Sequence, residues 1–345
     1  MNPHANMIII FSLILGPIIT ISSNHWITAW MGLEMNMFAI IPMITKKHHP
    51  RATEAAIKYF LTQTVASSLL LFSIINNTWD LGQLNMAQTS DTMSSMLMTI
   101  ALATKLGLAP FHFWLPETLQ GTTTMVALIL TTWQKLAPLS ILIMIHQLFN
   151  TPLLMTMSLL SICMGGWGGL NQTQLRKIMA FSSIAHLGWL TMILTMSTKL
   201  ALLTFYTYII MTSTTFIIID QLKTNNMSSM MTSWTKLPLM NVMMMLNLMS
   251  LAGMPPLTGF MPKLLILQEM QQAHTILATM ASIFSLLSLF FYLRISYFST
   301  ITLPPNTNNY HQQWRHKIKQ KPYLAYLTVI STMIMPITPT LIELM

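Results

Sequence analysis

Long apolar segments recur along this chain at the length that crosses a lipid bilayer. A membrane-spanning helix needs about 20 mainly apolar residues, and about eleven such segments can be counted. They lie at approximately 3–22, 25–44, 56–76, 93–119, 124–146, 152–171, 176–197, 199–220, 237–272, 275–296 and 322–342. Only 7% of the residues are charged, against about a quarter in soluble domains. The sequence therefore predicts an all-α polytopic membrane protein, with residues 1–345 forming a single integral membrane domain.

The positions of lysine and arginine support this count, because such residues gather on one face of a membrane protein. Thirteen of the seventeen fall on the side of the loops that follow the second, sixth, eighth and tenth segments. Only Lys199 lies on the opposite side. This asymmetry predicts an N-terminus on the basic side and a C-terminus on the other. It also explains the net charge of +9, so the basic cluster at 314–321 is interpreted as a juxtamembrane loop, and no nucleic-acid partner is expected.

Three lysines remain, and they lie inside apolar segments together with one acid, Glu34. A lysine stem spans about one helical turn, so an ammonium close to a segment end can reach the lipid headgroups. Lys105 and Lys135 lie at least 11 residues from both ends of their segments, which excludes this route. For Lys263, about nine residues from its nearer end, the route stays open. Inserting the four charges costs on the order of 10–14 kcal/mol, which predicts a functional site.

The chemistry that suits these residues is proton relay. Burial disfavours the charged form of both an amine and a carboxyl group, so each can take up and release a proton without a large barrier. Hydroxyl, amide and imidazole side chains between them can hold connecting water molecules. His112 and His186 are candidate intermediates, although each is as readily a hydrogen-bonded histidine with a packing role.

Two of the apolar segments contain helix-breaking residues. In 105–117, Pro110 and Pro116 cannot donate to the carbonyls of the preceding turn, and 251–263 contains three further prolines and two glycines. The ninth segment, 237–272, is also too long for one straight span, so it is either unwound in the middle or begins along the membrane surface. The two broken segments are five spans apart and therefore run in opposite directions. This predicts an inverted repeat of the transporter kind, with two broken helices and a site near the bilayer midplane.

Other features carry less functional weight. Gly165–Gly169 is interpreted as a close helix-packing surface, Asp220 as an interfacial cap, and Glu117 as a residue that reaches the membrane interface or joins the site. Cys163 is the only cysteine, and the sequence has no phosphate-binding loop, nucleophile–base arrangement or metal-ligand spacing. We therefore expect no cofactor and no metal in this chain.

Several stretches resemble the NADH dehydrogenase subunit 2 family of mitochondrial respiratory complex I, in its animal form. They are Met-Gly-Leu-Glu34, Lys-Leu-Gly-Leu-Ala-Pro-Phe-His-Phe-Trp-Leu-Pro-Glu117, Thr-Trp-Gln-Lys-Leu-Ala-Pro-Leu-Ser140, Gly-Gly-Leu-Asn-Gln-Thr-Gln-Leu-Arg-Lys-Ile-Met-Ala180, Phe-Ser-Ser-Ile-Ala-His-Leu-Gly-Trp189 and Pro-Pro-Leu-Thr-Gly-Phe-Met-Pro-Lys263. The resemblance runs essentially end to end. It implies an antiporter-like, proton-translocating membrane-arm subunit in which Glu34, Lys105, Lys135 and Lys263 match the family's relay residues.

The resemblance also implies where the subunit works and with what. Quinone reduction in other subunits would drive the relay, and those subunits would hold the flavin, the iron–sulfur clusters and the ubiquinone site. The partners would be other membrane-arm subunits, accessory subunits and lipids such as cardiolipin. The location would be the mitochondrial inner membrane, with the N-terminus in the matrix and the C-terminus in the intermembrane space. A stand-alone Mrp-type cation/proton antiporter is the main alternative, but Glu34 is the only mid-membrane carboxylate to bind a cation. A mere scaffold subunit leaves the buried charges unexplained.

Overall fold

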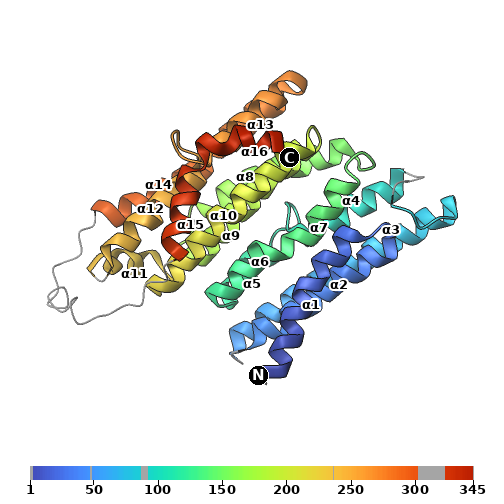
Figure 1. Cartoon of the computed structure of the whole chain (residues 1–345), viewed down its shortest axis with the longest axis horizontal. Helices are drawn as coiled ribbons and strands as arrows, with labels where there is room; N and C mark the ends of the chain where they lie inside the picture. The colour runs from blue at the N-terminus through green and yellow to red at the C-terminus, as the bar shows by residue number, and fades with distance from the viewer. Residues whose placement is uncertain (1–2, 47–48, 87–91, 236, 302–322, 345) are drawn as a thin grey trace. The chain divides into compact units, whose positions relative to one another are not determined.

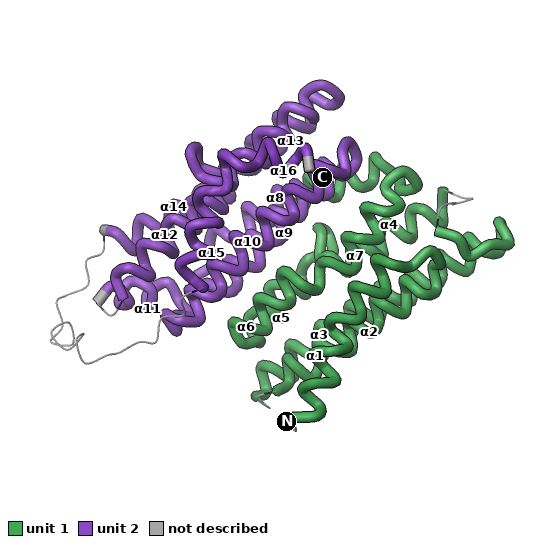
Figure 2. The backbone as a smooth tube through the Cα atoms, viewed as in Figure 1, with its two compact units in different colours: residues 1–161 green, residues 162–345 purple. Residues whose placement is uncertain are grey.

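The computed structural model describes residues 3–46, 49–86, 92–235, 237–301 and 323–344. The described residues form helices and short connections, and they divide into two compact units, residues 1–161 and 162–345 (Figures 1 and 2). Several basic residues that predict the orientation lie outside the described ranges, namely Lys47, Lys236, Arg315, Lys317, Lys319 and Lys321. The basic cluster at 314–321 lies outside them as well, and the orientation stays a prediction.

Unit 1 is a helical bundle that contains an interrupted helix. Its helices are α1 (Pro3–Ser22), α2 (Trp26–Thr45), α3 (Pro50–Leu81), α4 (Thr92–Leu106), α5 (Trp114–Gly121), α6 (Thr124–Thr131), α7 (Trp133–Met144) and the first part of α8 (Thr151–Gly169). Helix α3 packs against α2 and against the interrupted α4 and α5, α2 also packs against α1, and α7 contacts α1, α2 and α4. Two side chains of α7 fix this packing: Trp133 Nε1 donates to the Leu13 carbonyl at 2.8 Å, and Gln134 Nε2 to the Asn36 carbonyl at 3.0 Å.

Unit 2 is organised around α10 (Thr198–Leu222), which contacts the helices on both sides of a second interruption. The other helices are the rest of α8, α9 (Leu175–Leu194), α11 (Met227–Thr232), α12 (Pro238–Ala252), α13 (Phe260–Ala273), α14 (Thr275–Ile301), α15 (Tyr323–Met333) and α16 (Thr338–Leu344). Helix α10 packs against α9, α12, α13 and α15. The glycines of α8 give close packing as expected, because a Cβ on Gly165 would lie 2.9 Å from that of Ala185 on α9.

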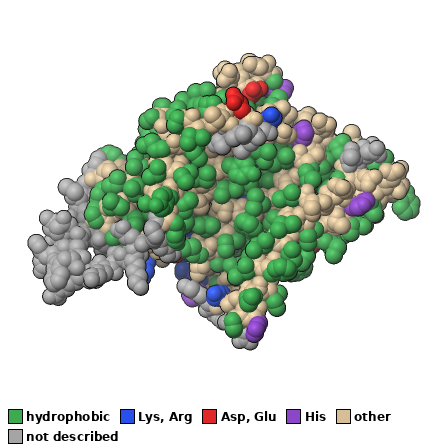
Figure 3. Space-filling view, in the orientation of Figure 1, with side chains coloured by type: hydrophobic (Ala, Val, Ile, Leu, Met, Phe, Trp, Pro, Cys, Tyr) green, Lys and Arg blue, Asp and Glu red, His purple; other side chains and the backbone are tan. Residues whose placement is uncertain are grey.

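Seven helical segments of the described chain are long and apolar enough to cross a membrane, at 3–22, 26–45, 50–81, 124–144, 175–194, 198–222 and 275–300. Each matches one of the eleven predicted spans. The other four correspond to α8 and to helices that are interrupted, so the total of eleven stays a prediction. Large apolar side chains such as Phe11, Phe72 and Leu286 are exposed, and apolar side chains dominate the face in Figure 3. Lipid is the solvent that such a surface requires.

The interruptions are where the structure adds most to the prediction. Two were expected, and both are present: α4 and α5 are separated by residues 107–113, and α12 and α13 by residues 253–259. The ninth segment is thus unwound in its middle. A third interruption was not expected, at Thr132, where φ is −112° and ψ is −67° and α6 gives way to α7. The predicted span at 124–146 is matched by the membrane-length segment 124–144, which contains this one-residue interruption.

Candidate functional site

The break between α4 and α5 places Lys105 in the last turn of a helix that ends inside unit 1. Gly107 adopts φ +80° and donates to the Thr104 carbonyl, while Leu108 donates to that of Ala103, which is a Schellman ending. The first residue of α5 closes the break from the other side, since Trp114 Nε1 donates to the Thr104 carbonyl at 3.1 Å. The helix end thus presents carbonyl oxygens, which stabilise a nearby cation.

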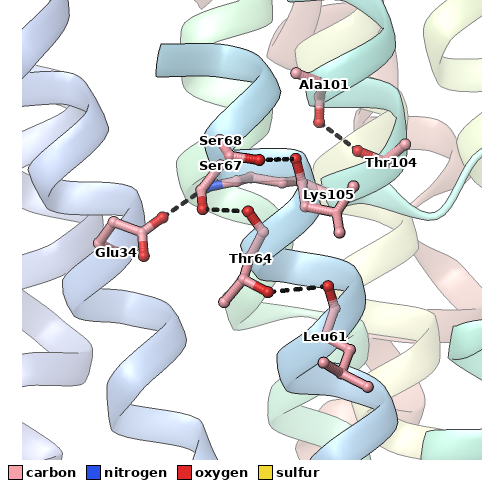
Figure 4. A network of polar contacts seen from close by, with 9 residues as sticks. Glu34, Leu61, Thr64, Ser67, Ser68, Ala101, Thr104 and Lys105 are labelled. Atoms are coloured by element: carbon pink, nitrogen blue, oxygen red, sulfur yellow. Dashed lines mark hydrogen bonds and ion pairs between the residues drawn. The ribbon is translucent and has the colours of Figure 1, made fainter. Parts of the chain in front are cut away.

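The Lys105 side chain meets Glu34 from α2, as Figure 4 shows. The Nζ atom lies 3.4 Å from Glu34 Oε1, and the two side chains are 4% and 13% exposed. The pair joins residues that are 71 positions apart in the sequence. The structure therefore brings together the two charges that the sequence could place only in separate spans.

Lys135 lines the same cavity as Lys105 and follows the unexpected interruption. It is the third residue of α7, three positions after Thr132, and only 3% of it is exposed. The hydroxyls of Thr131 and Thr132 donate to the carbonyls of Ala127 and Leu128, one turn earlier, at 3.0 and 2.7 Å. Such side-chain hydrogen bonds to the preceding turn often bend helices. This threonine pair, with Pro138 six residues further on, is the sequence signal that could have revealed the interruption.

A cavity of about 20 Å³ connects the two lysines. Its lining includes Lys105, Lys135, Asn36, Gln63 and Gln134. That volume holds about one water molecule, and water requires two to four polar partners, which this lining supplies. Proton exchange between the two amines through a single water molecule is therefore sterically and chemically feasible here.

Asn36 is a member of this site that the sequence analysis missed. It is 1% exposed, and neither its Nδ2 nor its Oδ1 has a hydrogen-bond partner among the described residues. A buried amide of this kind costs free energy unless a ligand or water binds it. Its position is two residues beyond Glu34 on α2, in the lining of the cavity, so a water molecule there would satisfy it.

The break in unit 2 has the same construction as the first. Gly253 adopts φ +80°, donates to the Ser250 carbonyl, and is followed by Met254 donating to Met249, again a Schellman ending. Lys263, in the first turn of α13, closes this break: its Nζ donates to the Ala252 carbonyl at 2.7 Å. Gly259 is also required, because a Cβ there would clash with the Ser250 carbonyl oxygen. Lys263 thus binds the carboxyl end of α12, the favourable end for a cation.

The two breaks share a longer sequence register than the residues beside each glycine indicate. Each glycine is followed by proline after three and nine residues, and by a charged residue after ten. These are Pro110, Pro116 and Glu117 in unit 1, and Pro256, Pro262 and Lys263 in unit 2. The match is easily overlooked because the final charge changes sign. A cis peptide bond precedes the first proline of each set.

Glu117, the counterpart of Lys263, belongs to a surface ion triad. Its Oε2 lies 2.8 Å from Lys58 Nζ, which also binds Glu54 Oε1 at 2.5 Å. The three side chains are 41–63% exposed. Glu117 thus reaches an exposed position rather than the buried site.

The two candidate histidines lie in different surroundings. His186 lines a second cavity of about 20 Å³ together with Lys263, Tyr208 and Thr207, which brings it to the unit 2 lysine. Lys263 also lines an open, mainly apolar pocket of about 540 Å³. His112 is buried in the first break and stacks on Phe113 with ring centroids 4.3 Å apart. It does not line the cavity between Lys105 and Lys135.

The geometry therefore defines two half-sites, each built at a broken helix. In unit 1 the amine of a Lys–Glu ion pair lines a water-sized cavity together with a second amine. In unit 2 an amine at a helix end faces a cavity that a histidine shares. Over the described ranges, no group of three His, Cys, Asp or Glu side chains could hold a metal ion. Continuity between the half-sites stays a prediction.

The fold of this chain is shared with chains of solved membrane complexes. It superposes on a chain of respiratory complex I from Thermus thermophilus with a TM-score of 0.83 and 22% identity, over 97% of this chain and 80% of that one. A chain of the Mrp complex from Dietzia sp. DQ12-45-1b gives a TM-score of 0.82 with 17% identity, over 97% and 76%. At these identities the likeness concerns the fold alone.

Sequence comparison is more specific. The family model of the NADH:quinone oxidoreductase/Mrp antiporter membrane region matches residues 23–288, and that of the NADH dehydrogenase subunit 2 C-terminus matches 289–342. The NADH-ubiquinone oxidoreductase chain 2 of Pelomedusa subrufa is 59% identical over 99% of both chains, and that of Gallus gallus 54% over the full length of both. The chain belongs to the NADH-ubiquinone oxidoreductase chain 2 family.

Proposed function

We propose that this chain is a proton-translocating subunit of the membrane arm of NADH:ubiquinone oxidoreductase. Family membership supports the assembly, because its curated relatives are named as chains of that enzyme. The observation that carries the proton function is the Glu34–Lys105 ion pair, whose lysine lines a cavity that Lys135 also lines. If these two positions had only a structural role, a well-packed pair of apolar side chains would serve it better than two amines around a water-sized cavity.

In the proposed relay, the charge state of each group determines whether the next group takes up or releases its proton. The Lys105 ammonium is stabilised by the Glu34 carboxylate and by the carbonyls that end α4. When Glu34 is neutralised or turned away, the ammonium loses its partner and releases its proton to water in the cavity. Lys135 then takes up that proton, and like charges at low dielectric prevent both amines from remaining protonated.

Lys263 is the proposed last station, with His186 as its neighbour. The Ala252 carbonyl holds the Lys263 ammonium at 2.7 Å, and the shared cavity can hold one water molecule between the amine and the imidazole. Passage of protons from Lys135 to Lys263 is part of this proposal. His112 is a further candidate intermediate beside the first break.

The chain would carry out no redox chemistry itself. Flavin, iron–sulfur clusters and ubiquinone would be bound by partner subunits, and quinone reduction there would supply the energy electrostatically. The chain would be a multi-pass protein of the mitochondrial inner membrane, with its N-terminus in the matrix and its C-terminus in the intermembrane space. Neighbouring membrane-arm subunits, accessory subunits and lipids such as cardiolipin would surround it.

Substitution of the unit 1 lysines tests the proposal. We expect Lys105→Ala and Lys135→Ala each to abolish most proton translocation by the assembled complex in sealed vesicles, measured with a pH-sensitive dye. Lys199→Ala is the matched control, since Lys199 is exposed in the first turn of α10. Normal translocation by both unit 1 variants in an assembled complex would refute the relay. Sodium-driven exchange by the isolated chain would instead support the Mrp-type antiporter.

A further inference from the structure

Helix α15 bridges the second break through one residue, Ser331. Its backbone carbonyl accepts a hydrogen bond from Thr258 Oγ1 at 2.5 Å, and its own hydroxyl donates to Asn247 Oδ1 at 2.5 Å. Asn247 belongs to α12, before the break, whereas Thr258 lies within the break, two residues before α13 begins at Phe260. All three residues are at most 1% exposed. One residue of α15 thus touches both sides of the interruption.

The hydrogen bonds are explained by what each helix end lacks. The last four carbonyls of an α-helix have no partner within it, and α15 ends at Met333, so the Ser331 carbonyl is one of them. An unpartnered carbonyl is costly where water is scarce. The Thr258 hydroxyl removes that cost for α15, and in doing so it fixes the unwound segment against the helix.

The hydrogen bonds through Ser331 and the bond from Lys263 to Ala252 cross the same helix interruption. Asn247 precedes the Ala252 carbonyl by five residues on α12, and Thr258 precedes Lys263 by five residues. Lys263 and Ala252 form the other bond across the same break. Holding Asn247 and Thr258 on a common anchor therefore sets where the Ala252 carbonyl meets the Lys263 amine.

We propose that Ser331 and Thr258 are positioning residues for proton release at Lys263, through which the carboxyl-terminal helix controls the geometry of the second broken helix. The proposal rests on the relay function proposed above. It assigns a mechanical role to α15, which lies in the region matched by the subunit 2 C-terminal family model. Ser331 and Thr258 themselves carry no proton in this proposal.

The test compares hydroxyl-deleting variants with matched controls in the assembled complex. Thr258→Val and Ser331→Ala each remove one half of the bridge, whereas Thr258→Ser keeps the hydroxyl and should restore function. Thr328→Val is the control on the same helix, because Thr328 is equally buried and donates only to the Ala325 carbonyl of α15 itself. Proton translocation in sealed vesicles is measured per assembled complex.

We expect Thr258→Val and Ser331→Ala to lower translocation about fivefold, which corresponds to about 1 kcal/mol for one hydrogen bond, with both controls near wild type. Wild-type translocation per complex in the two deleting variants would overturn the proposal, even if less complex assembles, because that pattern is a purely structural role. An equal loss in Thr328→Val would overturn it too. If the Thr258→Val complex does not assemble, the result for Ser331→Ala is the test of the proposal.

The Lys263→Ala variant distinguishes failure of the relay from failure of this inference. Normal translocation by Lys263→Ala would refute the role of Lys263 in the relay. A loss of translocation by Lys263→Ala, together with normal translocation by the Thr258→Val and Ser331→Ala variants, would refute only the positioning role of the bridge.

Discussion

Removing the charge of Glu34 is the sharpest perturbation of the first half-site. Glu34→Gln keeps the size of the side chain and its ability to accept a hydrogen bond from Lys105 Nζ, which lies 3.4 Å from Oε1. It removes only the negative charge opposite a lysine that is 4% exposed. Any effect therefore reports on electrostatics rather than on packing.

The expected magnitude follows from the separation and the burial of the pair. Two unit charges 3.4 Å apart attract by about 5 kcal/mol at an effective dielectric constant of about 20. Breaking a buried ion pair by removing one partner costs about 3–5 kcal/mol in proteins. Since each 1.36 kcal/mol is tenfold, the ratio of charged to neutral Lys105 falls by a factor of about 100 or more. A relay that needs this state should slow by at least about tenfold.

Proton translocation by the assembled complex in sealed vesicles measures this effect directly. Glu54→Gln is the matched control, because Glu54 also binds a lysine at 2.5 Å but is exposed, and its partner Lys58 keeps Glu117 at 2.8 Å. We expect the control to translocate protons normally. If Glu34→Gln translocates protons within twofold of wild type, the pair is not part of the relay and the electrostatic reasoning fails.

Three further predictions concern neighbouring features. Asn36→Leu removes both unpartnered polar atoms from the cavity and should lower proton translocation several-fold. Asn36→Ser keeps a polar atom there and should retain more activity. Equal translocation rates for the two variants would exclude a water-binding role of Asn36. Gly253→Ala forces a side chain into φ +80° and to within 3.0 Å of Lys263 Nζ, so thermal inactivation should show a loss of about 1–2 kcal/mol, with reduced translocation. Gly82→Ala, at φ +68° with open space around it, should show the stability loss alone. Lys58→Met breaks only the exposed triad and should leave vesicle translocation unchanged; a large loss would indicate that the triad carries protons.

Much of the architecture follows from local physics that the sequence contains. Apolar length and the scarcity of charge predict helices in lipid, and seven of the predicted spans are matched by membrane-length helices in the described chain. Glycine and proline predict the two broken helices, because only glycine readily adopts the left-handed conformation of Gly107 and Gly253, and proline leaves carbonyls unpartnered. The inability of Lys105 and Lys135 to reach the headgroups identifies them as site candidates without any structure.

Other features depend on contacts between residues far apart in the chain. Glu34 and Lys105 meet across 71 positions, Ser331 and Asn247 across 84, and Thr258 and Ser331 across 73. In lipid, apolar helices show little contrast between inward and outward faces, so hydropathy does not specify how each helix is rotated about its axis. The cavity between Lys105 and Lys135 likewise is lined by residues of α2, α3, α4, α5, α6 and α7, which only tertiary packing brings together.

The sequence by itself therefore determined that Lys105 and Lys135 are buried charges and where two of the three helix interruptions described above lie, because these follow from side-chain chemistry and backbone geometry within one or two turns. Tertiary structure alone decided the partners of the charged groups. Lys105 pairs with the Glu34 carboxylate, Lys263 donates to the Ala252 carbonyl at a helix end, and Glu117 pairs with the exposed Lys58. These partners differ although Lys263 and Glu117 both stand ten residues after the glycine of their helix interruption. The reason is that a partner is set by helix rotation and close packing between distant segments, which no local pattern encodes.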